Sequence, residues 1–284
     1  MSGDGIVIVT GVTAEHNLDN INPSGSVNIT TADGSDLTGG GDLSTTVVYT
    51  VPSGFSMTAG ADQLDGVAVV GEGTLIVVDT AAGALDLSKL TVDVVDITGA
   101  DLSNATVTWM TVAAGEELRL TSGQATGQTI LAAEDASAVI TVSGLASDAN
   151  LTNIGNATAT VNATVTGSID ITGNVHLGNV DKYTVSSGQT FVATADQVAG
   201  IAVDGDGSLT VTGSASNANL INLKAKVVDV TGAILTDTVT WMTVAAGDEL
   251  RLSSAQANGK SIGAASNASA VVTVSDLTDS TDLS

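Results

Sequence analysis

Short apolar stretches with β-branched residues at alternating positions recur along the chain. Examples are VVYTV from Val47, TVDVVDIT from Thr91 and SLTVT from Ser208, each bounded by Gly, Asn, Asp or Ser. Alternation over about four to eight positions indicates half-buried β-strands, and the bounding residues favour turns. The segment LAAEDASA from Leu131 contains helix formers, but its counterpart GAASNASA from Gly263 does not. The pattern therefore predicts an all-β protein and no helix.

The strands belong to a long internal repeat. The stretch TVTWMTVAAGEELRLTSGQATGQ from Thr106 returns, slightly changed, from Thr238, which is 132 residues later. The stretch YTVPSGFSMTAGADQLDGVAVVGEGTL from Tyr49 returns in the same way from Tyr183, 134 residues later. A strand of the G-x-L-x-V kind recurs twice as often, so that the period is about 66 residues. We assign a single array over residues 1–284, with repeats at about 5–72, 73–137, 138–206 and 207–269 and a partial fifth repeat at 270–284.

Two architectures accommodate a repeat of this length. In a parallel β-helix, or β-solenoid, each repeat makes three coils of about 22 residues, which gives about twelve coils in total. In the alternative, each repeat is a separate small β-sandwich domain, but about 66 residues are few for seven strands. In addition, no Pro- or Ser-rich linker separates the repeats, and steps such as Asn150-Leu151 and Asn219-Leu220 suit coil turns with a buried leucine. We therefore predict the parallel β-solenoid.

Alignment of the repeats predicts which side chains face the core. One aligned column reads Tyr49, Met110, Tyr183 and Met242 in chain order. The column directly before it reads Val48, Trp109, Lys182 and Trp241. Successive strand residues face opposite ways, and lysine is rarely buried, so the column with Lys182 faces solvent and the Tyr/Met column faces inward. Trp109 and Trp241 are then exposed on alternate repeats. Each either covers a neighbouring coil or forms a contact site for a glycan or another chain.

Composition and charge remove several classes of function. The chain has 31 acidic and 7 basic residues and a formal net charge of −24, so it lacks the Lys and Arg clusters that bind nucleic acids or anionic membranes. With no cysteine and two histidines, neither a nucleophile–base pair nor a thiolate metal site is indicated. No apolar run approaches the roughly 20 residues of a membrane span, and no signal peptide is visible. We predict that the protein is not an enzyme, binds no nucleic acid and does not span a membrane.

Two matching pairs of charged residues occur in the motifs EELRL and DELRL. Glu117 and Arg119, like Glu249 and Arg251, are two positions apart and therefore share one face of a strand. We expect a local ion pair in each repeat, which contributes little to stability at a surface. A catalytic arginine, as in polysaccharide lyases with a β-helix fold, is the alternative interpretation.

Aspartate provides 25 of the 31 acidic residues. Most are expected in turns, where the short side chain bonds the backbone. Calcium is the alternative, because it binds several hard oxygen ligands. The candidate ligands are Asp33, Asp36 and Asp42 in ADGSDLTGGGDLS, and Asp204 and Asp206 in DGDGS. The first segment resembles a degenerate copy of the repeats of RTX proteins. The second begins like an EF-hand loop but lacks its glycine and its final glutamate.

The motif T-V-x-x-G-x-x-L-x-L-x-x-x-Q-x-x-G occurs as TVAAGEELRLTSGQATG from Thr111 and TVAAGDELRLSSAQANG from Thr243. It resembles the repeats of large secreted bacterial surface proteins, which include adhesins, S-layer-associated proteins and other β-strand-repeat chains. Such proteins are often exported without a cleaved N-terminal signal. The resemblance implies a non-catalytic extracellular protein at the cell surface that serves as a scaffold, stalk, adhesive fibre or layer.

The two ends of the array suggest how copies associate. Residues 270–284 begin a repeat with the kind of strand that also opens the chain, so both ends are expected to be sheet edges that stack head to tail or edge to edge. Alternatively, the array was cut from a longer one. Two other classes of function remain. A glycan- or ice-binding module needs a flat exposed ladder of Thr or aromatic residues, and a polysaccharide-active β-helix enzyme needs a cleft of Asp, Arg and Lys.

Overall fold

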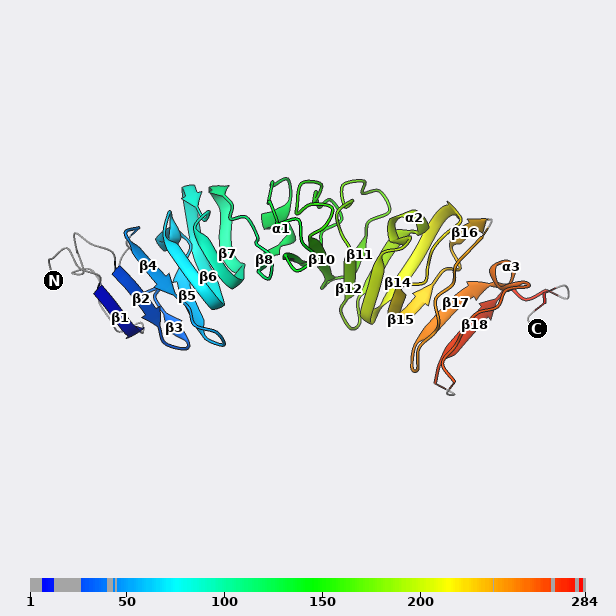
Figure 1. Ribbon diagram of the computed structural model, residues 1–284. Helices are drawn as coiled ribbons and strands as arrows, with labels where there is room; N and C mark the ends of the chain where they lie inside the picture. The colour runs from blue at the N-terminus through cyan, green and yellow to red at the C-terminus, as the bar shows by residue number, and fades with distance from the viewer. Residues whose placement is uncertain are drawn as a thin grey trace. The chain divides into compact units, whose positions relative to one another are not determined.

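The chain is an all-β parallel β-solenoid of about 12 turns with little helix (Figure 1). The computed structural model describes residues 7–12, 27–39, 43, 45–236, 238–266, 269–278 and 281–282. The predicted fold class is therefore confirmed. The alternative of tandem sandwiches is wrong, because a sandwich is built from antiparallel sheets and the ladders described below are parallel.

The strands are mostly four to seven residues long, and three of them are much longer. In chain order they are β1 (Val7–Val12), β2 (Val27–Thr31), β3 (Ser35–Asp36), β4 (Val47–Thr50), β5 (Ser56–Gly60), β6 (Ala68–Asp86), β7 (Leu90–Thr108), β8 (Glu117–Thr121), β9 (Val139–Ser143), β10 (Thr160–Val165), β11 (Ile169–Asp170), β12 (Lys182–Val185), β13 (Thr190–Thr194), β14 (Ala202–Ser216), β15 (Leu223–Asp229), β16 (Ala233–Thr236), β17 (Glu249–Ser253) and β18 (Val271–Ser275). The helices are the single turns η1 (Asp62–Leu64), α1 (Ser122–Ala125), α2 (Ala195–Val198) and α3 (Ser254–Ala257).

Contacts divide the chain into two compact units. Unit 1 comprises Met1–Thr141 and Leu151–Val161, and unit 2 comprises Val142–Asn150 and Asn162–Ser284. Each unit has its own stack of turns. The helices within the described residues are far too short to be bilayer-spanning segments.

Unit 1 is built on ladders that place apolar side chains one above another. In one ladder Tyr49 of β4 lies opposite Val69 of β6, which lies opposite Leu90 of β7, so these turns take 20 and 21 residues. In the second ladder the stacked residues come from β5, β6, β7 and β8, and they are Met57, Leu75, Val95 and Leu118. All four are at most 1% exposed. The core is thus built from columns of apolar side chains that stack from one turn to the next.

Unit 2 repeats this construction with one additional aromatic ring. Tyr183 of β12 lies opposite Val203 of β14, and Phe191 of β13 lies opposite Leu209 of the same strand. The rings of Tyr183 and Phe191 pack against each other with centroids 4.8 Å apart. Burial also raises the pKa of the Tyr183 hydroxyl far above its ordinary value. Two rings therefore fill the space where unit 1 has Tyr49 and Met57 at the matching positions.

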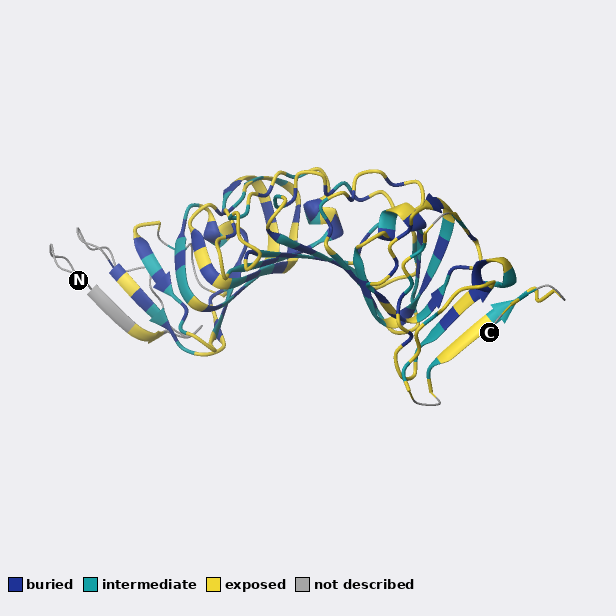
Figure 2. Cartoon of the chain, turned by 45° about the vertical axis from the view of Figure 1, so that its right-hand side comes forward, coloured by how far each residue is buried: buried dark blue, intermediate teal, exposed yellow. Residues whose placement is uncertain are grey.

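Burial alternates along the strands, as Figure 2 shows. The inner column is confirmed: Tyr49, Met110, Tyr183 and Met242 are 1–2% exposed. The expectation that both tryptophans stand exposed is wrong in degree, because Trp109 and Trp241 are half-buried. Their rings lie outside the core column, but neighbouring segments cover part of each ring. The leucines of the N-L steps, Leu151 and Leu220, are buried as expected.

Glycines permit close contact where the chain turns between two faces. In the segments G-E-G and G-D-G, a Cβ on Gly71 or Gly205 would lie 2.3 Å from the carbonyl oxygen of Val51 or Val185 in the preceding turn. Both glycines also have positive φ, 123° and 104°, which side chains other than that of glycine disfavour. These positions therefore set how closely successive turns approach at this corner.

A second recurring turn explains seven of the 25 aspartates. In a D-x-S/T step the carboxylate accepts the backbone N–H two residues on, a local bond that Asp forms readily because its side chain is short. This occurs at Asp36, Asp86, Asp96, Asp101, Asp135, Asp170 and Asp229, with N–O distances of 2.8–3.0 Å. Asn156 and Asn174 form the same turn with an amide oxygen. The predicted turn role of aspartate is confirmed at these positions.

Candidate functional site: a pocket beside Trp109

A pocket of about 510 Å³ lies beside Trp109 in unit 1. One wall is the C-terminal part of β7, and the other is the turn that contains α1. Besides the indole, its polar lining consists of Asp101, Ser103, Thr121, Gln124 and Gln128. An aromatic ring and side chains that bond hydroxyl groups thus line one space.

The pocket exists because β7 extends farther than the strand that pairs with it in the next turn, β8. β7 runs beside β6 as far as Thr108, which pairs with Asp86. On its other side β7 pairs with β8 only from Val94 to Asp96. The following turn then closes with the single helical turn α1 instead of another long strand, so within the described part of unit 1 no strand covers the outer edge of β7 beyond this point.

Gln124 anchors the α1 wall to the turn before it. Its side-chain carbonyl accepts the Thr121 N–H at 2.7 Å, and its own N–H donates to Thr121 Oγ1 at 3.3 Å, which is a reciprocal capping box. Its side-chain Nε2 donates to the carbonyls of Ile97 and Ala100, both at 2.7 Å. The Q-x-x-G segment therefore encodes a staple, by which we mean a glutamine side chain that hydrogen-bonds the backbone of the preceding turn of the solenoid.

Trp109 is held in place by Gln128. The indole Nε1–H donates to Gln128 Oε1 at 3.1 Å, across 19 residues of sequence and thus from the next turn of the solenoid. Both side chains are half-buried. This bond uses the carbonyl of the Gln128 amide. No partner for its NH₂ is found among the described residues.

Asp101 contributes a carboxylate at the rim. Hydrogen bonds from the side chain and the backbone N–H of Ser103 hold the pKa of Asp101 below its ordinary value, so this carboxylate is ionised at neutral pH. It is exposed and is the one ionisable group in the described lining. The pocket therefore offers one anionic acceptor and no cation.

The matching position in unit 2 lacks the bond that fixes Trp109. Trp241 Nε1 is buried and has no hydrogen-bond partner within the described residues. The residue 19 positions later is Lys260, where unit 1 has Gln128, and a lysine ammonium group cannot accept a hydrogen bond. The two tryptophans occupy matching positions in the sequence, but their surroundings differ in the structure. The Trp109 ring is fixed by a hydrogen bond, whereas the Trp241 Nε1–H has no acceptor among the described residues.

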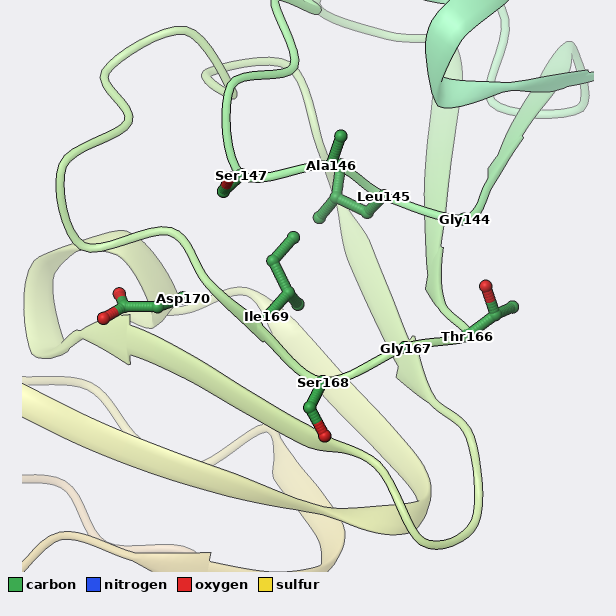
Figure 3. Close-up of a pocket in the computed structure, with 9 residues that line it drawn as sticks. All are labelled: Gly144, Leu145, Ala146, Ser147, Thr166, Gly167, Ser168, Ile169 and Asp170. Carbon is green, nitrogen blue, oxygen red and sulfur yellow. The ribbon is translucent and has the colours of Figure 1, made fainter.

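A second pocket, of about 550 Å³, lies in unit 2 (Figure 3). Figure 3 shows Leu145 and Ile169 extending toward one another from two segments. Ser168 accepts the Thr190 N–H at 3.0 Å, and Asp170 accepts the Thr172 N–H at 2.9 Å. Among described residues, no aromatic side chain lines this pocket, whereas the indole of Trp109 lines the other one.

The four predicted calcium ligands that the structure describes are not brought together as a metal site. Asp33 accepts the Ser56 N–H at 3.2 Å, Asp36 caps its own turn, and Asp42 lies outside the described residues. Asp204 and Asp206 lie within β14 and not in a loop. Asp204 pairs with Lys182 at 2.8 Å. Among described residues, no group of three or more potential metal ligands is found.

The matching charged pairs form ion pairs as predicted. Arg119 contacts Glu117 at 2.6 Å, and Arg251 contacts Glu249 at 2.8 Å. Burial of Glu117 would raise its pKa, but hydrogen bonds from Arg119 and Thr141 outweigh that effect and lower it. Each arginine thus has a local partner.

The sequence identified Trp109 as a candidate contact residue but missed the other residues of the pocket. The spacing of 19 residues between Trp109 and Gln128 matches about one turn, which is the pattern that would have found the pair. Comparisons of the chain with protein-family models, with curated proteins and with solved structures found no match.

Proposed function

We propose that this chain is a non-catalytic structural repeat protein of the cell surface, an extracellular scaffold, stalk or fibre that associates with its own kind. The observation that supports this most directly is that the recurring polar chemistry serves the stacking of turns. Four glutamines of the Q-x-x-G motif each donate to a carbonyl of the preceding turn, and these are Gln63, Gln124, Gln197 and Gln256.

The staple is built in the same way at each position. The glutamine side chain also accepts a backbone N–H three residues earlier in all four, at 2.7–2.8 Å. In α1, α2 and α3 the residue that donates this N–H caps the glutamine in return. A chain whose repeated polar residues bond its own neighbouring turns is suited to mechanical and architectural roles.

The last described strand supports self-association. Leu250 of β17 is fully buried because Val272 of β18 stacks on it, whereas Val272 itself is 39% exposed and Val271 is 45% exposed. A further parallel strand stacked on β18 would bury Val272 in the same way and would pair the edge of β18 that no described strand pairs. A second copy of the chain can supply such a strand head to tail.

Electron microscopy and sedimentation of the purified chain test this proposal. We expect filaments or sheets, which Val272→Lys abolishes, because a lysine at the open end of the core column would be desolvated on stacking. Val175→Lys is the matched control, since Val175 is 82% exposed and away from β18. Monomers of the wild-type chain under all conditions would contradict the proposal.

Calcium is tested in the same experiment. If it bridges copies through the aspartate side chains, assembly appears with calcium and disappears with a chelator. Assembly that is identical under both conditions assigns the aspartates to turns alone.

A further inference from the structure

The pocket beside Trp109 combines two features that a carbohydrate requires. The C–H face of a sugar ring packs on an aromatic ring, and its hydroxyl groups need donors and acceptors at the edge of that ring. Here the indole of Trp109 lines one pocket together with the hydroxyls of Ser103 and Thr121, the amide of Gln128 and the carboxylate of Asp101. The volume of about 510 Å³ falls within the range of about 300–1,000 Å³ that is typical of small-ligand sites.

We propose that this pocket binds a neutral carbohydrate, one or two rings of a glycan, stacked on Trp109. The ring is fixed before binding, because its Nε1–H is bonded to Gln128 Oε1 at 3.1 Å. Fixing the aromatic surface in advance reduces the entropy lost when the ligand binds. The NH₂ of the same amide is left to donate to a hydroxyl of the sugar.

The charge of the pocket defines the class of sugar. Asp101 is ionised and exposed, and it accepts hydrogen bonds from hydroxyl groups. No lysine or arginine lies in the described lining, and the whole chain carries a net charge of −24. Sialic and uronic acids would therefore be repelled, whereas neutral hexoses and N-acetylhexosamines would not.

An extended peptide is the competing ligand, since the outer edge of β7 is open. Such a peptide would add as a strand and would need the carbonyl of Ala100 near the start of that edge. That carbonyl already accepts a hydrogen bond from Gln124 at 2.7 Å. The arrangement therefore favours the sugar, and peptide binding becomes an outcome of the test.

The first experiment probes the full chain with an array of neutral oligosaccharides that end in hexoses or N-acetylhexosamines, their sialylated and uronic acid counterparts, and a set of extended peptides. We expect binding to neutral oligosaccharides alone. No binding to any neutral oligosaccharide, or stronger binding to the acidic counterparts or to peptides, would overturn the proposal.

Variants then locate the site. Trp109→Ala should weaken binding of the selected oligosaccharide at least about ten-fold. Gln128→Lys should weaken it several-fold by releasing the ring, and it introduces a residue that the chain itself has at the matching position, Lys260. Trp241→Ala is the control and should bind as the wild type does. An unchanged affinity in Trp109→Ala with an unchanged circular dichroism spectrum, or an equal loss in Trp241→Ala, would refute the assignment.

Fluorescence provides a second readout that does not depend on truncating Trp109. The chain has two tryptophans, so Trp241→Phe leaves Trp109 as the one indole and Trp109→Phe leaves Trp241. Addition of the oligosaccharide should shift the emission of the first variant and not that of the second. The opposite pattern, or no shift in either, would count against stacking on Trp109. Because the pocket lies within unit 1, this result is independent of whether copies of the chain assemble.

Discussion

Gln256 and Val230 belong to successive turns of unit 2, and the Gln256 Nε2 donates to the Val230 carbonyl at 2.6 Å. The same nitrogen donates to Ala233 at 2.7 Å, and both bonds are buried. The amide therefore satisfies two carbonyls of one turn while its oxygen caps the helical turn of the next. A single side chain thus links the local shape of a turn to the stacking of the solenoid.

Replacement of this glutamine should be costly. Gln256→Leu keeps most of the volume, but it leaves the carbonyls of Val230 and Ala233 buried without a donor and removes the acceptor for the Ser253 N–H in the capping box of α3. We expect a loss of about 2–4 kcal/mol in the free energy of unfolding, measured by urea denaturation. Gln189→Leu is the control, since among the described residues its side chain has one hydrogen bond, which it accepts from the exposed Ser168 hydroxyl at 3.3 Å. Equal losses in the two variants would contradict the staple.

The position of Gly205 should tolerate no side chain. In Gly205→Ala the new Cβ would lie 2.3 Å from the Val185 carbonyl oxygen, on a residue with a φ of 104°. We expect a loss of about 3 kcal/mol in stability. Gly167→Ala should change stability by less than about 0.5 kcal/mol, because nothing lies within 4 Å of its Cβ position. A thermal melt of both variants decides this, and similar melting temperatures would refute the expected clash.

Giving Trp241 an acceptor should stabilise unit 2. Lys260→Gln places an amide where Gln128 stands relative to Trp109, so the buried Nε1–H of Trp241 gains a partner. We expect a gain of about 1 kcal/mol in unfolding free energy. Lys260→Leu removes the same charge but supplies no acceptor, and it should not produce this gain. If both variants are equally stable, the orphan donor is not what limits this position.

Acid should weaken the fold through the aspartate turns. The backbone N–H of Ser137 and of Thr172 holds the pKa of Asp135 and Asp170 below the ordinary 3.8. A carboxylate with a lowered pKa in the folded state contributes stability above its unfolded pKa, and that contribution is lost as the pH falls through its folded pKa. The melting temperature should therefore decrease below about pH 4.

Asparagine provides the matched control for this pH dependence. Asn156 and Asn174 form the same turn without titrating in this range. The double variant Asp135→Asn, Asp170→Asn should keep most of the stability at pH 7 and lose less of it on acidification. A pH profile identical to that of the wild type would show that other groups cause the acid sensitivity.

Much of the fold could be predicted from the sequence, because each turn of a solenoid repeats the same local pattern of strands and turns. Alternation along TVDVVDIT sets a strand with one buried face, and recurrence of the pattern sets the stacking. The column Tyr49, Met110, Tyr183 and Met242 was assigned inward by alignment alone and is buried. The helical turn at Gln124 was not foreseen, because four residues are too few for a periodic pattern and the bonds that stabilise this turn come from the preceding turn of the solenoid.

The sequence by itself determined the all-β class, the repeat, the inner column and the turn chemistry of aspartate, since each depends on residues close together in the chain or on their regular spacing. Only the tertiary structure decided what surrounds each tryptophan. Trp109 and Trp241 stand in identical TVTWMTVAAG contexts, yet the first bonds Gln128, whereas the buried Nε1–H of the second has no partner among the described residues. The pocket likewise depends on how far β7 extends past the turn that follows it. Both features depend on contacts between neighbouring turns, which local sequence does not specify.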